Sequence, residues 1–473
     1  MTLSIKGGGG IINEVPKVSG LKVTAFEMDT IDIEYKVEDV ELTICRHYLL
    51  LNGVRTEITK QVGYESSTNI FKYQITGLKL NTPYTIQIRA TDGHDEGLSK
   101  AIQQTTKNGI VYGVRVMENN SNPSSCITYI EEAVGVTPAN STSLGGWADK
   151  WPFKDIRMVG LKNGAVTKEI NPNKKTHYKD GSVVPHDVDV MVEFPKIYWN
   201  FTNISNGYEL RISNAQMNSN YVCLAHKVGG LEKDYIYIGA YLGYNEGGKL
   251  RSISGVRPTI MTPMAQFRQY AHNVGDGYQQ FNWFTLILSQ NLYLIAYKNL
   301  NSQQALGYGY ANYDHNNNGT NTGGTNTKGM IYGESGGKQQ ICFLGIEDFY
   351  GNLSQWVDGI KIDGSCNTFV TPDNKIFNDN ASGYKNIGRF TNESIHGKIS
   401  KVAHTNEGGF FPRECNGSET TYYCDYAHLI PNYVTNFGGD YDDKLEAGAF
   451  NLNLDAVASN QYSVISSRLC YLG

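Results

Sequence analysis

The stretch Glu347-Asp-Phe-Tyr-Gly-Asn-Leu-Ser-Gln-Trp-Val-Asp358 decides the fold of this 473-residue chain. Its Gly-Asn pair predicts a tight turn that leads into an aromatic strand. A second glycine turn follows in Phe437-Gly-Gly-Asp-Tyr-Asp-Asp443, and the chain closes with Ser467-Arg-Leu-Cys470. These three segments, in this order, predict short strands joined by long loops.

The sequence before this stretch predicts strands and then helices. Apolar and polar residues alternate at 188–198 and 235–241, which is the period of a half-buried strand. The segment 263–272 predicts a helix with Thr262 as its N-cap. The segment 281–298 predicts a second helix, which must be largely buried because apolar residues cover most of its faces.

Together these elements resemble the fold shared by C-type-lectin-like domains and formylglycine-generating enzymes. Residues 108–473 look most like the large C-type-lectin-like domains found in structural and receptor-binding proteins of tailed bacteriophages. The resemblance implies an α+β domain in which long loops cover a small sheet. It also implies that Trp356, the tryptophan of the family's Gly-Asn-x-x-x-Trp segment, is a core residue.

Residues 18–107 predict a separate all-β domain of seven short strands. Asn52-Gly53 stands where a tight hairpin needs positive φ. The segment 75–90 resembles the fibronectin type III pattern, with Leu80 four residues before a corner tyrosine, Tyr84. Tyr35 departs from that pattern, because the family usually has a tryptophan there. The expected fold class is therefore a fibronectin III-like sandwich followed by an α+β C-type-lectin-like domain.

The first 17 residues cannot form a core of their own. They contain four successive glycines, Gly7 to Gly10, after a short apolar stretch. This composition predicts either a segment that attaches the chain to another protein or a flexible joint. No signal peptide is expected, because Met1-Thr-Leu-Ser-Ile-Lys6 runs into glycines and not into an apolar stretch.

Composition fits a recognition surface and a loop-rich β protein equally well. The 32 Tyr and 51 Gly, with abundant Asn and Ser, are typical of recognition surfaces and also of loop-rich β proteins. A net charge of −5 argues against nucleic acid as the main partner, since phosphate binding needs a basic face. No apolar run reaches 18 residues, so no membrane insertion is expected.

The spacing of the eight cysteines is more typical of buried thiols than of a catalytic cysteine pair. Bridges between Cys415 and Cys424 or between Cys342 and Cys366 are alternatives to single thiols. An oxidase of the formylglycine-generating type needs two cysteines a few residues apart near the C-terminus. Only Cys470 lies in the closing strand, so it is interpreted as a core residue and no enzyme activity is expected.

Metal binding is also weighed and not expected. Asp314-His-Asn-Asn-Asn-Gly319 matches the first half of a calcium loop, but Thr325 stands where a bidentate Glu is needed. The surrounding tract, 311–328, is expected to be a surface loop because it is too polar to pack. The Glu-Pro-Asn and Gln-Pro-Asp motifs of calcium-dependent sugar binding are absent from the sequence. No cofactor or metal site is therefore predicted.

The resemblance implies that the stretch after the Gly-Gly turn carries exposed contact residues. Tyrosines among carboxylates and amides can stack on a sugar ring or hold a protein loop. A run of acids such as this is otherwise a solvated turn with no ligand. The predicted ligand-binding residues are Asp440, Tyr441, Asp442, Asp443, Asn451, Asn453, Asn460 and Tyr462. Tyr422 to Tyr426 and Tyr433 extend the same predicted patch.

The resulting hypothesis is a non-enzymatic, tail-associated virion protein of a phage, made in the host cytoplasm. Its expected partners are a bacterial surface receptor, glycan or protein, and other virion proteins bound through residues 1–17. Several weak sites on one particle gain avidity, and a homotrimer fits that expectation. The alternatives are a decoration protein of the capsid or tail without a host ligand, and an enzyme of the formylglycine-generating type.

Overall fold

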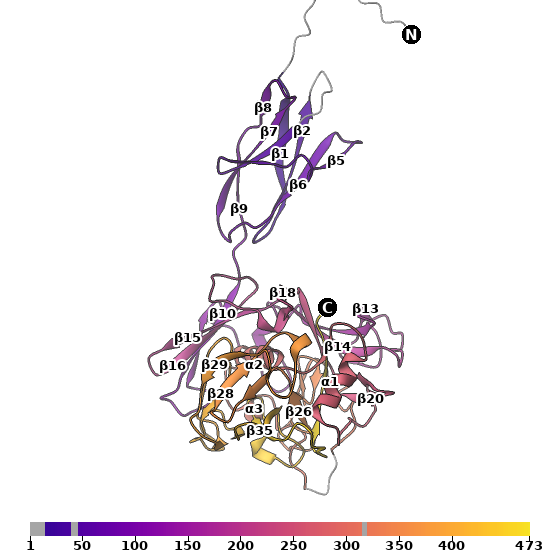
Figure 1. Ribbon diagram of the computed structural model, residues 1–473, viewed down its shortest axis with the longest axis vertical. Helices are drawn as coiled ribbons and strands as arrows, with labels where there is room; N and C mark the ends of the chain where they lie inside the picture. The colour runs from indigo at the N-terminus through magenta and orange to yellow at the C-terminus, as the bar shows by residue number, and fades with distance from the viewer. Residues whose placement is uncertain (1–14, 39–45, 315–318) are drawn as a thin grey trace, which may run out of the picture. The chain divides into compact units, whose positions relative to one another are not determined.

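The computed structural model describes residues 15–38, 46–314 and 319–473. The chain divides into two compact units, Met1–Gly109 and Ile110–Gly473 (Figure 1). Regular structure is mostly β-sheet in both units. The predicted attachment segment, 1–17, lies outside the described residues except for its last three.

Two sheets form the first unit, where nine strands are described and seven were predicted. One sheet has the order β1-β2-β6-β5, and the other has the order β4-β3-β7, with β8 and β9 both pairing with β7. The strands are β1 (Lys17–Phe26), β2 (Ile31–Glu38), β3 (Arg46–Leu51), β4 (Val54–Glu57), β5 (Gly63–Glu65), β6 (Ile70–Ile75), β7 (Pro83–Thr91), β8 (Glu96–Leu98) and β9 (Ile102–Thr105).

Local signals in this unit are confirmed by its geometry. Asn52 and Gly53 join β3 to β4 with φ of 49° and 83°, as the hairpin prediction requires. Tyr84 is buried, and its hydroxyl accepts a hydrogen bond from the Lys79 N–H at 2.8 Å, which forms the predicted tyrosine corner. Tyr35 is 1% exposed and fills the core from β2.

The second unit contains two six-stranded sheets. The first is antiparallel throughout, with the order β13-β12-β14-β19-β37-β22. Its strands are β12 (Arg157–Lys162), β13 (Ala165–Glu169), β14 (Asp189–Pro195), β19 (Tyr235–Gly239), β22 (Tyr278–Gln280) and β37 (Leu469–Tyr471). The closing strand β37 thus pairs with β19, more than 200 residues earlier in the chain.

The second six-stranded sheet has the order β30-β33-β35-β34-β26-β36. Two of its pairs, β33–β35 and β26–β36, are parallel, and the others are antiparallel. Its strands are β26 (Ser354–Val357), β30 (Ile395–Lys398), β33 (Tyr426–Leu429), β34 (Val434–Phe437), β35 (Leu452–Ala456) and β36 (Ile465–Ser466). The segment 347–358 therefore supplies β26 to this sheet, and the second glycine turn begins at Phe437, the last residue of β34.

The remaining sheets have two to four strands each. The four-stranded sheet contains β10 (Val111–Met117), β11 (Ile127–Glu131), β15 (Tyr198–Ile204) and β16 (Gly207–Ser213). The three-stranded sheets contain β23 (Ile331–Tyr332), β24 (Cys342–Phe343), β25 (Ile346–Glu347), β27 (Ile360–Ile362), β28 (Asn367–Val370) and β29 (Lys385–Arg389). The two-stranded sheets contain β17 (Lys227–Val228), β18 (Leu231–Glu232), β20 (Tyr244–Glu246), β21 (Lys249–Arg251), β31 (Lys401–Val402) and β32 (Pro412–Glu414).

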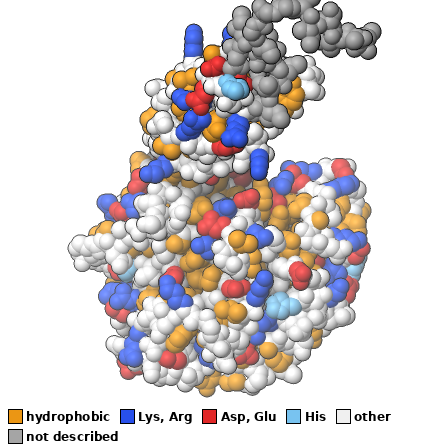
Figure 2. Space-filling model, turned by 45° about the horizontal axis from the view of Figure 1, so that its top comes forward, with side chains coloured by type: hydrophobic (Ala, Val, Ile, Leu, Met, Phe, Trp, Pro, Cys, Tyr) orange, Lys and Arg blue, Asp and Glu red, His pale blue; other side chains and the backbone are white. Residues whose placement is uncertain are grey.

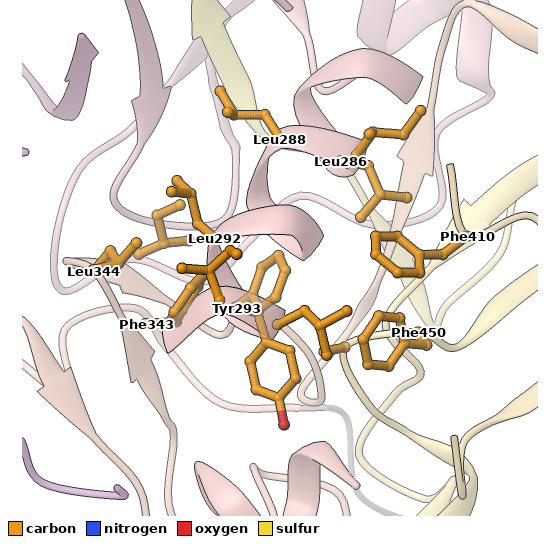
Figure 3. Close-up of a cluster of buried hydrophobic side chains, with 14 of the residues drawn as sticks. Leu286, Leu288, Leu292, Tyr293, Phe343, Leu344, Phe410 and Phe450 are labelled. Carbon is orange, nitrogen blue, oxygen red and sulfur yellow. The ribbon is translucent and has the colours of Figure 1, made fainter. Parts of the chain in front are cut away.

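Three α-helices are found among the described residues of the second unit: α1 (Met264–His272), α2 (Trp283–Tyr297) and α3 (Ser302–Ala305). Every residue of α2 is buried, as predicted, and the helix packs against aromatic side chains from distant loops (Figure 3). The prediction of Thr262 as the N-cap of α1 was wrong. Its hydroxyl donates to the Ile260 carbonyl, and Pro263 occupies the cap position.

The stretch 347–358 lies at the centre of this unit. Trp356 is 0% exposed, which confirms it as a core residue. Arg468 explains why the chain closes on Ser-Arg-Leu-Cys, because its buried guanidinium donates to the backbone carbonyls of Gly239, Glu347 and Asp348. One side chain therefore joins β19, the 347–358 stretch and the closing strand.

The Asn/Gly/Thr tract after residue 311 does not behave as predicted. Thr322 and Thr325 are buried, and the Glu347 carboxylate accepts hydrogen bonds from the N–H groups of Gly323 and Thr325 at 2.6 and 2.7 Å. The expectation that this tract is too polar to pack was therefore wrong for Thr322 and Thr325, whereas Gly324 between them is exposed as a surface loop requires. A buried carboxylate supplies the acceptors that these backbone donors need.

Candidate functional site

Tyr441 was predicted to be an exposed contact residue, and this prediction was wrong. Its side chain is 4% exposed and packs with Leu242 and Leu353. The backbone fixes this orientation, because the Tyr441 N–H donates to the Asn352 carbonyl and its own carbonyl accepts from the Tyr313 N–H. Contacts with these distant loops therefore turn the ring inward.

The three aspartates beside Tyr441 are half-buried and fold back on their own turn. The Asp440 N–H donates to Asp443 Oδ2 at 2.8 Å, and the Asp442 N–H donates to Asp440 Oδ1 at 2.9 Å. Burial raises the pKa of Asp440 to about 7 and that of Asp443 to about 6. We call residues 440–446 the acidic loop.

The last four predicted binding residues have different environments. Asn451 is 1% exposed, and its amide donates to the Glu446 carbonyl, so its prediction as a contact residue was wrong. Asn460 is exposed, and half-buried Tyr462 accepts hydrogen bonds from it and from the Val457 N–H. Asn453 is half-buried on β35.

Asn453 belongs to a row of polar side chains on one face of the second six-stranded sheet. In β33 and β35 the small and aliphatic residues are buried, and the polar residues between them are partly exposed. This alternation follows from the period of two in a strand. We call this surface the polar sheet face; it comprises His396, Lys398, Tyr426, His428, Asn453 and Asp455.

Strand register brings the polar groups of this face together. His396 on β30 lies opposite His428 on β33, and their rings meet edge to face at 5.9 Å. His428 Nδ1 lies 3.4 Å from Asp455 Oδ2, and His428 is also the register partner of Asn453 on β35. The face therefore presents two imidazoles, a carboxylate and an amide across three neighbouring strands.

A pocket of about 250 Å³ is lined in part by Leu445, whose carbonyl accepts a hydrogen bond from Lys398 Nζ of the polar sheet face. Polar side chains dominate its wall. The lining residues are Asn301, Gln303, Gln304, Tyr308, Ser335, Glu419, Cys424, Asp425 and Leu445. The acidic loop contributes Leu445, so the pocket and the polar sheet face adjoin the same loop.

Asp425 is the most perturbed group in this pocket. It is 1% exposed, and its Oδ2 accepts hydrogen bonds from the Phe450 N–H at 2.8 Å and from the Ser302 hydroxyl at 3.4 Å. Burial raises the pKa of Asp425 to about 8. The carboxyl group is therefore harder to ionise than a solvent-exposed aspartate, and its hydrogen bonds with Phe450 and Ser302 hold it within the pocket wall.

Sequence reasoning missed His396 and His428, and it named Asp425 only as part of the segment 422–426. The available signal was the alternation of Tyr426-Ala-His-Leu429, which matches the alternation in β35. Nothing in the sequence shows that these two strands are neighbours. On the face seen in Figure 2, basic and acidic side chains are interspersed over the surface.

The predictions about the cysteines can be compared with the structure residue by residue. All described cysteines are free, and all except half-buried Cys415 are buried. Cys470 is 0% exposed, and burial raises its pKa to about 12, which confirms it as a core residue. Residues 315–318 of the calcium-like segment lie outside the described residues. Among the residues that the structure describes, no group of three or more His, Cys, Asp or Glu is placed to hold a metal ion.

No helix in the described ranges combines the length and the apolar character needed to cross a membrane. This observation concerns helices alone, and the longest of them, α2, owes its apolar character to its place in the core.

Comparisons with known proteins give only weak likenesses. No family model and no curated protein matches the chain. A Yersinia enterocolitica family 28 exopolygalacturonase is 15% identical, with 20% of each chain covered and a TM-score of 0.17. The fibronectin type-III domain of human fibronectin type III domain containing protein 3 is 13% identical over 22% of this chain and 94% of that domain, with a TM-score of 0.15.

A chimeric titin Z1Z2-Z1Z2 tandem is 11% identical over 46% of this chain and 91% of its own, with a TM-score of 0.14. The chain spans about a fifth of the length of the polygalacturonase. The weak neighbours thus include fibronectin type III and immunoglobulin-like β domains. At these TM-scores they assign neither a family nor a function.

Proposed function

We propose that this chain is a non-enzymatic virion protein of a tailed bacteriophage, associated with the tail, that recognises a bacterial surface receptor. The receptor, a glycan or a protein, binds to the polar sheet face and the adjoining pocket of a C-type-lectin-like domain. Residues 1–17 attach the chain to other virion proteins. The phage context comes from the resemblance of the segments 347–358, 437–443 and 467–470.

The observation that carries the proposal is the row of polar side chains across β30, β33 and β35. Its imidazoles and carboxylate can donate and accept hydrogen bonds in one surface, and the Asn453 side-chain N–H groups can donate there, since the oxygen of that amide is buried. Neighbouring strands fix the backbone under each group, so few degrees of freedom are lost when a ligand binds. Of the predicted contact residues this surface keeps Asn453, and it excludes Tyr441 and Asn451 because they are buried.

The pocket beside the acidic loop complements this face. Its wall offers carboxyl, amide and hydroxyl groups within about 250 Å³, which is the size of a small polar group such as one sugar residue. A glycan that lies on the polar sheet face can place one unit in the pocket. The exposed groups of the wall, the Gln304 amide and the Glu419 carboxyl, then form hydrogen bonds with that unit.

Binding of the fluorescently labelled full-length chain to a panel of intact bacteria and to a glycan array tests the proposal. Binding to one class of cell or glycan is expected. The double variant His428→Ala and Asn453→Ala should weaken that binding about tenfold or more, because both groups are central to the face. The control His94→Ala, an exposed histidine of the first unit, should bind as wild type does.

The other outcomes select the alternatives. A chain that binds no cell and no glycan favours a decoration protein. Binding that is unchanged in the double variant places the receptor site elsewhere. Release of new sugar ends from any array glycan during incubation contradicts the non-enzymatic proposal.

A further inference from the structure

Lys175 is a buried lysine with a thiol as its nearest polar partner. Its side chain is 0% exposed, and its Nζ lies 3.0 Å from Cys342 Sγ and 3.1 Å from Thr325 Oγ1. Within the described ranges no carboxylate oxygen lies at ion-pair distance from this amine. Buried amines usually have a carboxylate partner, because an unpaired buried charge is costly.

Both sides of this contact are fixed by other bonds. The Lys175 N–H donates to the Asn326 carbonyl at 3.0 Å, and Thr325 Oγ1 donates to Glu347 Oε2 at 2.7 Å. The Thr325 oxygen is therefore free to accept from the amine. These contacts hold the end of the lysine side chain against the sulfur.

The three-stranded sheet fixes the position of Cys342. This residue lies in β24, between β23 and β25, and is 0% exposed. Its Sγ is 3.5 Å from the carbonyls of Gly329 and Met330, which can accept the thiol proton. A sulfur lone pair is then directed to the amine of Lys175. The two reactive atoms are thus adjacent, ordered and shielded from bulk water.

Other described thiols have different surroundings. The Sγ atoms of Cys126 and Cys424 have backbone carbonyls as hydrogen-bond acceptors, Pro123 O and Thr421 O respectively, both at 3.6 Å. The amine–thiol contact is therefore a particular property of the Lys175–Cys342 pair and does not follow from burial alone.

We propose that Lys175 and Cys342 form an oxidative crosslinking site, in which one oxygen atom joins Nζ to Sγ as a nitrogen–oxygen–sulfur bridge. One thiol, one amine and one molecule of dioxygen give the bridge and one molecule of water. The S–H bond and one N–H bond break, and S–O and O–N bonds form. Sulfur and nitrogen each lose two electrons, and the two oxygen atoms take up these four. The bridge spans slightly less than the present 3.0 Å separation, so little movement is needed.

The crosslink has a structural consequence. It ties the loop after β13 to β24 and joins two residues that are 167 positions apart. A covalent link of this span restricts the unfolded chain and so stabilises the folded one. The protein can therefore fold in its reduced form and gain stability later, when oxygen reaches it.

Mass spectrometry of the full chain tests this proposal. Protein purified without oxygen in the presence of a phosphine reductant should gain about 14 Da in air, because one oxygen atom enters and two hydrogens leave. Hydrogen peroxide should give the same product, with two molecules consumed and three waters formed. Peptide mapping should find one crosslinked peptide pair that contains Lys175 and Cys342, and renewed reduction should separate it.

Matched variants identify the atoms. Cys342→Ser and Lys175→Arg should abolish the gain, whereas Cys470→Ser and Lys174→Arg, a buried thiol elsewhere and the exposed neighbouring lysine, should retain it. Wild-type protein that gains no such mass in air or peroxide overturns the proposal. So does a gain of about 16 or 32 Da confined to Cys342, which marks ordinary sulfenic or sulfinic acid. Peptide mapping of wild type gives the answer even if a variant fails to fold.

Discussion

At the scale of single residues, buried carboxyl groups determine how the second unit responds to pH. Burial raises the pKa of Asp425 to about 8, that of Asp440 to about 7 and that of Asp443 to about 6. Each group binds its proton more tightly in the folded state than in the unfolded state. Together these three groups therefore contribute a stabilisation that is present below about pH 4 and is lost as pH rises towards about pH 8.

Asp425→Asn should flatten this pH dependence. Asn carries no titrating proton, and its side-chain oxygen can still accept from the Phe450 N–H. Between about pH 5 and about pH 8 the free energy of unfolding should fall less in the variant than in wild type, by about 1 to 3 kcal/mol. The reason is that wild type must ionise a buried carboxyl group over this range, whereas the variant has none at this position. Urea unfolding at both pH values measures this difference.

Glu419→Gln is the control for this measurement, since Glu419 lines the same pocket but is exposed. Its pH dependence should follow that of wild type. Equal pH dependence in Asp425→Asn and in the control would mean that Asp425 is ionised in the folded protein, contrary to its burial.

The sequence predicts single residues well where a local rule fixes their side chains. Tyr84 follows from a corner pattern, and Trp356 follows from the turn before it; both are buried as expected. Tyr441 and Asn451 lie in loops, where no period states which way a side chain points. Contacts with Tyr313 and Asn352, about 90 to 130 residues earlier, decide the burial of Tyr441. Such contacts have no local signature.

At the scale of elements, α2 shows how a polar residue can start a fully buried helix. Asn282 is 5% exposed, and its side-chain oxygen accepts from the N–H groups of Phe284 and Thr285. These donors have no partner within the helix, and both residues are buried. Asn282 therefore provides the hydrogen-bond acceptor for the first N–H groups of the helix, and this helix contributes much of the core (Figure 3).

Asn282→Ala should lower the free energy of unfolding of the second unit by about 1 to 2 kcal/mol, the usual cost of a lost N-cap. Thr262→Ala is the informative comparison, because the sequence indicates a cap there and the structure shows none. It should cost less than about 1 kcal/mol, since only one hydrogen bond to the Ile260 carbonyl is lost. Urea unfolding of both variants ranks them, and an equal cost for the two contradicts the assigned caps.

The sequence predicts elements in which apolar and polar residues alternate with a clear period. The ends of these elements depend on residues with special backbone properties. The strand expected at 188–198 ends at Pro195, which lacks an N–H, and a new strand begins at Tyr198. The prediction of a surface loop failed within residues 322–325 because Glu347, about 20 residues later, accepts hydrogen bonds from the backbone there. Periodicity reports the environment of a regular element, but it does not report buried polar partners of a loop.

At the scale of the whole molecule, long-range pairing gives the second unit its form. Ile238 on β19 pairs with Cys470 on β37, and the buried Arg468 joins these strands to Glu347 and Asp348. The sequence predicts the order of these elements but not the sheet that assembles them. The candidate site depends on the same kind of pairing, because the row on the polar sheet face exists only once β30, β33 and β35 are neighbours.

The two compact units should unfold in separate transitions, since each contains its own buried core. Calorimetry of the full chain measures this directly. Tyr84→Phe removes the acceptor of the Lys79 N–H in the first unit, so it should shift one transition to lower temperature by an amount equivalent to about 1 to 2 kcal/mol. Tyr64→Phe should shift neither, because its hydroxyl contact with Asn69 is exposed. Asn282→Ala should move only the other transition; one common transition shifted by both Tyr84→Phe and Asn282→Ala would show that the units fold as a single cooperative body.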